Sequence, residues 1–341
     1  MRTIDWDPDK NNIIMIDQTL LPKEYRIIEC TNIESLCEAI KSLRVRGAPA
    51  LGAAGGFGVA LASYKSDASS LGDLLDDVKA AGKKIINTRP TAVNLSWGVK
   101  RVIKAIEDAN TVKEIRFFSL DEAKAIADED VEKNRILGKY GAALLKDGDT
   151  VMTHCNAGRL ACVDWGTALG VIRSAREEGK DIKVIACETR PLNQGSRITA
   201  WELMEDKIPV TLITDSMSGH VMRKGMVDKV IVGADRITQD AVFNKIGTYT
   251  HSVIAKEHGI PFYVAAPVST FDFEHLEDDI EIELRKPDEL KYFGSHLIAP
   301  LNVDVYNPAF DATPMENVSA IITENGVFYP PFLLDEVRIK K

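Results

Sequence analysis

The sequence predicts an α/β protein in which a smaller α+β domain precedes a Rossmann-like, doubly wound parallel sheet domain. From Thr150 onward, short continuous apolar segments alternate with amphipathic ones, a pattern typical of a parallel sheet covered by helices on both faces. Before that point, segments with helical periodicity dominate. A chain of 341 residues is long enough for two domains, and we assign them to residues 1–120 and 121–341.

The predicted sheet has five strands, each a buried apolar run. They are Thr150–Cys155, Ile182–Glu188, Val210–Asp215, Lys229–Asp235 and Pro261–Pro267. The helices expected between them are Cys162–Glu177, Ser196–Lys207, Met217–Met226 and Tyr249–His258.

The first domain is predicted to contain two short strands and several helices. The strands are Asn12–Asp17 and Glu24–Glu29, and the helices are Ile33–Leu43, Ala48–Ser63, Leu71–Ile86 and Ala92–Glu107. The small residues of Ala48–Ser63 predict close helix packing. Asn110–Glu114 is expected to be a loop, and Asp121–Leu145 a long amphipathic helix.

The composition argues against several classes of partner. The formal net charge of −9 disfavours nucleic acid and anionic membranes, which bind basic surfaces. The longest uncharged stretch, Gly47 to Tyr64, contains five glycines and is a poor membrane span. An odd number of widely spaced cysteines does not fit a secreted disulfide framework, and the charged N-terminus lacks a signal peptide's apolar core. We expect a cytoplasmic protein.

Polar residues follow four of the predicted strands, where an open parallel sheet binds its ligands. These segments are His154–Asn156, Cys187–Arg190, Thr214–Asp215 and Gly233–Arg236. They could form a site, although loops at strand ends are commonly polar without one.

Cys155 is the strongest candidate for a catalytic residue among the five cysteines. It lies between an apolar strand and a glycine-containing turn, where N–H groups at a helix start would favour a thiolate. The alternative is a buried, inert cysteine. That role is assigned to Cys30, Cys37, Cys162 and Cys187, which lack such a turn.

Asp235 follows a predicted strand in the sequence Gly-Ala-Asp-Arg. Partial burial would raise the pKa of this carboxyl and suit it to proton transfer. The alternatives are an ion pair with Arg236 or a helix cap.

The segment Arg44–Ala50 resembles an anion cradle, since arginine and glycine precede a predicted helix. It matches neither a P-loop nor a dinucleotide fingerprint, and the alternative is a helix start with Pro49 in the first turn. Asn244 and Lys245 are expected to open the last major helix. The histidines show no ligand spacing, and no CxxC pair occurs, so no metal is predicted.

Nine segments of the chain, in order, resemble the methylthioribose-1-phosphate isomerase family. They are Arg46–Ala50, Thr88–Leu95, Thr153–Gly158, Gly166–Arg173, Glu188–Leu203, Val232–Ile237, Asn244–Tyr249, Pro261–Pro267 and Asn307–Pro314. The superfamily also includes ribose-1,5-bisphosphate isomerases and regulatory subunits of translation-initiation exchange factors.

The resemblance implies that Cys155 and Asp235 form the catalytic pair. It also implies that substrate is bound by Arg46, Gly47, Ala48, Arg89, Gln194, Asn244 and Lys245. The family further implies a sugar-phosphate isomerase of methionine salvage that forms a homodimer and needs no cofactor.

Two alternatives to a methylthioribose-1-phosphate isomerase remain. One is an isomerase of 5-deoxyribose 1-phosphate or ribose 1,5-bisphosphate, and the other is a non-catalytic regulatory subunit. The sequence departs from the family pattern in three places, and the first could change the group accepted at the sugar's C5. The loop between Ile237 and Asn244 is one residue shorter and lacks glycine, Asp164-Trp165 precedes Gly166, and Leu284 replaces an acidic residue.

Overall fold

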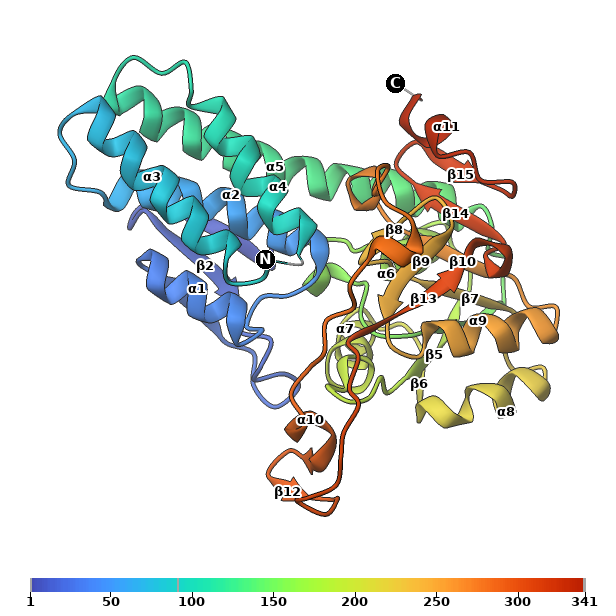
Figure 1. Ribbon diagram of the computed structural model, residues 1–341. Coiled ribbons are helices and arrows are strands. Elements are labelled where there is room, and N and C mark those ends of the chain that lie inside the picture. Colours follow the sequence, from blue (N-terminus) through green and yellow to red (C-terminus); the bar gives the residue numbers. More distant parts are fainter. Residues whose placement is uncertain (1, 91, 340–341) are drawn as a thin grey trace. The chain divides into compact units, whose positions relative to one another are not determined.

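A computed structural model describes residues 2–90 and 92–339, so Thr91 of the Thr88–Leu95 segment lies outside the described residues (Figure 1). The chain forms two compact units. Unit 1 comprises Met1–Ile136 with Ala157–Gly170, and unit 2 comprises Leu137–Asn156 with Val171–Lys341. The domain boundary after residue 120 stays a prediction. The two compact units meet in the sequence after residues 136, 156 and 170.

Unit 1 combines an antiparallel three-stranded sheet with five helices. The strands are β1 (Ile4–Asp7), β2 (Asn12–Ile16) and β3 (Ile27–Cys30), and the helices are α1 (Ile33–Lys41), α2 (Ala48–Lys65), α3 (Leu71–Ile86), α4 (Val93–Ala105) and α5 (Val112–Ala142), whose last turns belong to unit 2. Strand β1 was not predicted. The predicted loop Asn110–Glu114 is wrong in its second half, because the Thr111 hydroxyl accepts the Glu114 N–H and α5 begins there.

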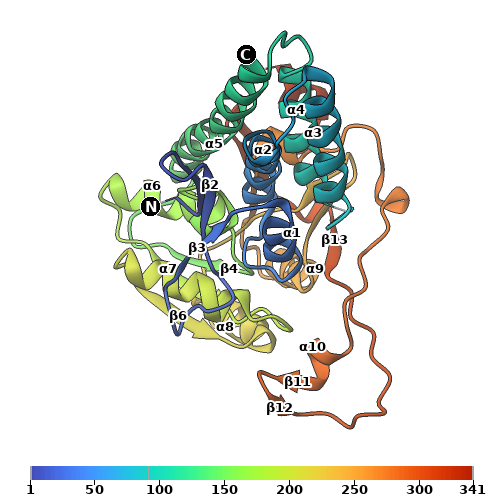
Figure 2. The same ribbon diagram turned by 90° about the vertical axis from the view of Figure 1, so that its left-hand side faces the viewer.

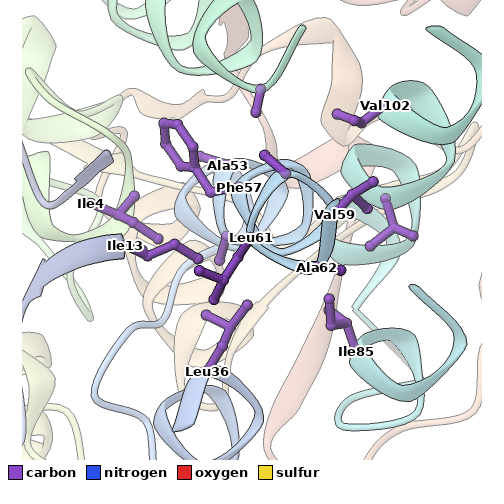
Figure 3. Close-up of a cluster of buried hydrophobic side chains, with 14 of the residues drawn as sticks. Ile4, Ile13, Leu36, Ala53, Phe57, Val59, Leu61, Ala62, Ile85 and Val102 are labelled. Atoms are coloured by element: carbon purple, nitrogen blue, oxygen red, sulfur yellow. The ribbon is translucent and has the colours of Figure 1, made fainter. Parts of the chain in front are cut away.

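Helix α2 forms the centre of the core of unit 1, with Ala53, Phe57 and Leu61 surrounded by side chains from β1, β2, α1, α3 and α4 (Figure 3). Its packing on α4 requires glycine. A Cβ on Gly98 would lie 2.0 Å from the Gly52 carbonyl oxygen, which no side chain allows. The small residues of α2 therefore permit close helix packing, as the sequence predicted.

Unit 2 is built on a seven-stranded sheet in the order β15-β14-β10-β7-β4-β5-β6. Its strands are β4 (Thr150–Thr153), β5 (Lys183–Cys187), β6 (Val210–Ile213), β7 (Lys229–Val232), β10 (Phe262–Ala265), β14 (Ala320–Thr323) and β15 (Gly326–Phe328). All neighbours pair in parallel except β14 with β15. On one side of β4 lie β5 and β6, and on the other side lie β7, β10 and β14, which is the Rossmann order. The predicted fold class is confirmed.

Two of the helices between these strands differ in form from the prediction. The expected helix Cys162–Glu177 is replaced by a 3-10 turn, Arg159–Ala161, an irregular stretch and α6 (Ala168–Glu177). Trp165 and Gly166 both have positive φ, which interrupts any helix through them. The expected helix Ser196–Lys207 begins as a π-helix, Gly195–Thr199, and continues as α7 (Ala200–Glu205). Helices α8 (Ser218–Arg223) and α9 (Thr248–Glu257) follow β6 and β9, respectively.

A second sheet, not predicted from the sequence, joins β13 (Phe310–Pro314), β9 (Ala241–Lys245) and β8 (Arg236–Ile237) in antiparallel pairs. Asn244 and Lys245 lie in β9, so the prediction that they open a helix is wrong. Gly247, with φ of 103°, separates the strand from α9.

Residues 280–306 form an arm that extends away from the seven-stranded sheet of unit 2 (Figure 2). It carries α10 (Asp288–Lys291) and the two-residue strands β11 (Tyr292–Phe293) and β12 (His296–Leu297). Beyond β15, the described chain ends in α11 (Leu334–Ile339). Among residues 2–90 and 92–339, no helix is both long and apolar enough to cross a membrane.

Candidate active site

Two of the predicted site residues follow adjacent strands at the point where the strand order of the sheet reverses. Strands β4 and β7 pair in parallel, with Val151 opposite Lys229, and the strand order reverses between them. Cys155 lies two residues after the end of β4, and Asp235 lies three residues after the end of β7. Since parallel strands end at the same edge, the fold brings the loops of Cys155 and Asp235 together where open α/β sheets bind ligands.

Cys155 adopts a left-handed backbone conformation, with φ of 62°, and only 9% of its surface is exposed. Its N–H donates to the Thr189 hydroxyl at 2.8 Å, and its carbonyl accepts from the Thr199 hydroxyl at 2.6 Å. No regular helix starts at the turn after it, since a 3-10 turn at Arg159–Ala161 comes first. The backbone of Cys155 is therefore held by two threonine side chains, and the regular helix start that the sequence suggested is not there.

Asp235 is half-buried in a bend between β7 and β8, and its N–H donates to the Phe243 carbonyl at 2.8 Å. It caps no helix, because β8 follows it directly. Arg236 forms its ion pair with Asp272, at 2.9 Å. The backbone contact to β9 fixes the position of this residue at the end of the sheet.

Asn244 and Lys245 are buried at the end of β9, with 5% and 8% exposed. The Asn244 amide donates to the Thr248 hydroxyl at 3.1 Å. The Lys245 ammonium donates to the Ala309 carbonyl at 2.8 Å and lies 4.5 Å from the centre of the Phe310 ring. A cation held in this way, with its stem buried, is fixed in direction and suits an anionic ligand.

Gln194 is 6% exposed and precedes the π-helix Gly195–Thr199. Gly195 permits this turn, because a Cβ there would lie 1.6 Å from the Cys187 carbonyl oxygen. Such π-helical turns are frequent at functional sites, because the extra residue redirects side chains.

The remaining predicted site residues belong to unit 1. Arg46 is 8% exposed, and Gly47 is the N-cap of α2 without a side-chain cap. Ala48 begins α2, and its amide belongs to the positive end of an 18-residue helix. Arg89 is half-buried after α3.

A model of the initiation factor 2 subunit family matches residues 44–330. Methylthioribose-1-phosphate isomerase of Heliobacterium modesticaldum is 53% identical over 338 residues, covering 98% of this chain and 97% of that protein. The chain belongs to the methylthioribose-1-phosphate isomerase family. The crystal structure of 5-methylthioribose 1-phosphate isomerase from Pyrococcus horikoshii OT3 is similar, with a TM-score of 0.92 and 46% identity over 98% of this chain and 96% of that one.

A second similar structure bears a different name. A protein of A. fulgidus, described as translation initiation factor eIF-2B, subunit delta, has a TM-score of 0.89 and 61% identity, covering 97% of this chain and 96% of that one. The similar chains of this isomerase family thus carry both enzyme and initiation-factor names.

The departures from the family pattern have local structural explanations. The short loop after Ile237 is a tight turn in which Thr238 donates its N–H to the Ala241 carbonyl at 2.9 Å. Trp165 packs under the Arg135 guanidinium, 4.1 Å from its ring centre. Leu284 lies in the arm and is 65% exposed.

Sequence patterns missed a buried pair of histidines, His154, which directly precedes Cys155, and His251. His154 Nε2 lies 2.9 Å from the Ile246 carbonyl, which can only accept, so Nε2 carries the proton. Burial lowers the pKa of His154 to about 4 and that of His251 to about 3. Both rings are therefore neutral at pH 7, and His251 Nε2–H donates to His154 Nδ1 at 3.1 Å.

The same pair belongs to a cluster that could hold a metal ion, in which donor atoms of His154, Cys187, Asp215 and His251 lie within 4.8 Å of one another. Hydrogen bonds already use most of these atoms. Both oxygens of Asp215 accept backbone N–H groups, from Thr189 and Arg190. Burial raises the pKa of the Cys187 thiol, which keeps it protonated. These hydrogen bonds explain why the four side chains lie close together without a metal ion. That the protein binds no metal stays a prediction.

Replacing Gly47 with alanine is expected to destabilise the protein by about 1–3 kcal/mol, the usual range for overpacking. Gly47 has φ of +93°, and a Cβ there would lie 2.3 Å from the Ala161 carbonyl oxygen. Thermal and urea unfolding measure the change. Gly72→Ala is the matched control, because a Cβ at that helical position meets no atom within 4 Å. It should leave stability unchanged or raise it by up to about 1 kcal/mol. Equal stability of the two variants would contradict the constraint at Gly47.

Proposed function

We propose that this chain converts 5-methylthioribose 1-phosphate to 5-methylthioribulose 1-phosphate in methionine salvage, with Cys155 and Asp235 as its acid–base pair. The observation that carries the proposal is their position after β4 and β7, the paired strands at which the sheet order reverses. The similarity over the whole chain to proteins named for this reaction supports the substrate.

The chemistry explains why two such groups are needed. An aldose 1-phosphate has an esterified anomeric oxygen, so its ring does not open without help. We assign protonation of the ring oxygen to Asp235, and work at the carbon centres to Cys155, with the exchanged roles as the alternative. Hydrogen then moves from C2 to C1, either by a cis-enediol or by direct hydride shift. Solvent deuterium at C1 of the product would favour the enediol.

We assign the phosphate to groups that suit an anion. Arg46 and Arg89 offer guanidinium donors, Gly47 and Ala48 offer amides at the start of α2, and Lys245 offers a fixed ammonium. Gln194 and Asn244 complete the proposed binding residues. Holding the substrate in one orientation supplies part of the rate.

A product assay by NMR tests the proposal. Purified protein receives 5-methylthioribose 1-phosphate, 5-deoxyribose 1-phosphate and ribose 1,5-bisphosphate in parallel, and we expect the first to be converted to its ketose at the highest kcat/KM. Preference for another sugar would replace the substrate but keep the isomerase. Folded protein that binds these sugars and converts none would favour the second candidate, a regulatory subunit, which the name of the A. fulgidus structure suggests.

We propose a cytoplasmic homodimer that does not bind nucleic acid. The arm, residues 280–306, exposes apolar side chains, and its regular structure is one short helix, α10, and a two-stranded hairpin that is marginally stable alone. Its exposed large apolar residues are Leu284, Phe293, Leu297, Ile298, Leu301, Val303 and Tyr306. Five free cysteines suit a reducing compartment, and the net charge of −9 disfavours nucleic acid. Light scattering of the wild type and of Leu301→Lys tests the dimer, which the lysine should weaken.

A further inference from the structure

The backbone at Cys155 is held in a conformation that it would not adopt without support. Its φ of 62° lies in the left-handed region, which residues other than glycine rarely occupy. Such conformations persist only when the surroundings enforce them, and they cluster at active sites. At Cys155 the enforcing contacts are two threonine hydroxyls, one from the loop after β5 and one from the π-helix Gly195–Thr199.

Thr189 holds the N–H of Cys155. It follows β5 and is completely buried, and its Oγ1 accepts the Cys155 N–H at 2.8 Å. The same hydroxyl lies 3.1 Å from the Cys187 carbonyl, to which it donates. Thr189 is itself strained, since a β-branched residue with φ of 66° is an outlier. Its N–H donates to Asp215 at 2.8 Å, which fixes that conformation.

Thr199 holds the carbonyl of Cys155. It ends the π-helix Gly195–Thr199, is completely buried, and donates its hydroxyl to the Cys155 carbonyl at 2.6 Å. Its oxygen accepts the Asn156 amide at 3.1 Å. That amide also donates to Glu202 at 3.0 Å, and Glu202 is ion-paired with Arg173 at 2.8 Å. The position of Thr199 is thus fixed by a buried polar network.

We propose that Thr189 and Thr199 are positioning residues that lock Cys155 in its left-handed conformation and so direct its thiol at the substrate carbons. The inference rests on the proposed catalytic role of Cys155. Neither threonine is assigned contact with the substrate. Both act through the two backbone groups of one residue, and loss of either hydroxyl leaves a buried N–H or C=O of Cys155 without its partner.

The test removes each hydroxyl without changing the size of the side chain. Thr189→Val and Thr199→Val should each lower kcat about 10- to 100-fold, the effect expected of a displaced reacting group, with KM changed less than about threefold. Thr189→Ser and Thr199→Ser keep the hydroxyl and should restore kcat to within about threefold of wild type. Thr270→Val is the control, because the buried Thr270 hydroxyl has no hydrogen-bond partner among the described residues.

A second readout does not depend on turnover. Alkylation of Cys155 by iodoacetamide, followed by peptide mass spectrometry, should change in rate by more than about threefold in the valine variants, because thiol reactivity depends on its surroundings. The rate should return to the wild-type value in the serine variants. If a valine variant fails to fold, the alanine variant at the same position removes the hydroxyl with less crowding.

The outcomes separate the two proposals. Wild-type protein that converts no sugar phosphate contradicts the proposed function, and the alkylation rates still decide the role of the threonines. Folded valine variants with wild-type kcat and alkylation rate would overturn the positioning role. Serine variants as impaired as valine variants would also overturn it, because they retain the hydroxyl.

Discussion

Replacement of Cys155 by serine is expected to lower kcat for the isomerisation by about two to four orders of magnitude, the range for losing a general acid or base. A serine hydroxyl is far less acidic than a thiol, so it cannot exchange a proton with the substrate near neutral pH. The backbone contacts of Cys155 to Thr189 and Thr199 do not involve the side chain and should persist. KM should therefore change much less than kcat.

The matched control for this variant is Cys37→Ser. Cys37 is also buried, with 6% of its surface exposed, but it lies on α1 in unit 1. Its thiol has no assigned role, so kcat should stay within about twofold of wild type, a difference well below that of a lost acid or base. Activity of Cys155→Ser close to that of Cys37→Ser would remove Cys155 from the mechanism.

Asp235→Asn is expected to produce a loss of similar size, about two to four orders of magnitude in kcat. The amide is nearly isosteric with the carboxyl but cannot donate an acidic proton to the ring oxygen. The Asp235 N–H bond to Phe243 is made by the backbone and remains in the variant. The change therefore removes proton transfer and leaves the fold of the β8–β9 hairpin intact.

Asp240→Asn makes the same substitution in the turn of that hairpin. Asp240 is exposed and accepts hydrogen bonds from the Thr238 hydroxyl and the Glu277 N–H, which an amide oxygen can replace. We expect near-normal kcat. The pH profile adds a further criterion: loss of Asp235 should abolish the limb of kcat/KM that reports its ionisation. An unchanged profile would exclude the carboxyl as the titrating group.

The sequence was sufficient to predict most of the parallel sheet, because strands β4, β5, β7 and β10 are largely buried and appear as apolar runs. It placed Cys155 and Asp235 at strand ends, but not on neighbouring strands, because strand order depends on contacts far apart in the chain. Only the family resemblance predicted that the two residues act together as a catalytic pair. The structure then put both residues at the point where the sheet reverses.

Other features left weaker signals in the sequence. Strands β8 and β9 form a short hairpin whose turn, Thr238 to Ala241, has no glycine, so the segment was assigned to a loop and a helix start. Thr189 and Thr199 look like ordinary polar residues next to a strand and a helix. Their hydrogen bonds to the Cys155 backbone depend on the left-handed conformation of Cys155 and on the π-helical turn, and neither feature can be predicted from the sequence.

The segment Ala157–Gly170 belongs to unit 1, although the chain on either side of it belongs to unit 2. The Thr3 N–H donates to the Val163 carbonyl, and the Gln18 amide donates to the Leu160 carbonyl, so β1 and the turn after β2 depend on residues far along the chain. No single cut in the gene can therefore yield both units whole. A fragment ending near residue 136 would lack part of its own core, because Val163 belongs to that core.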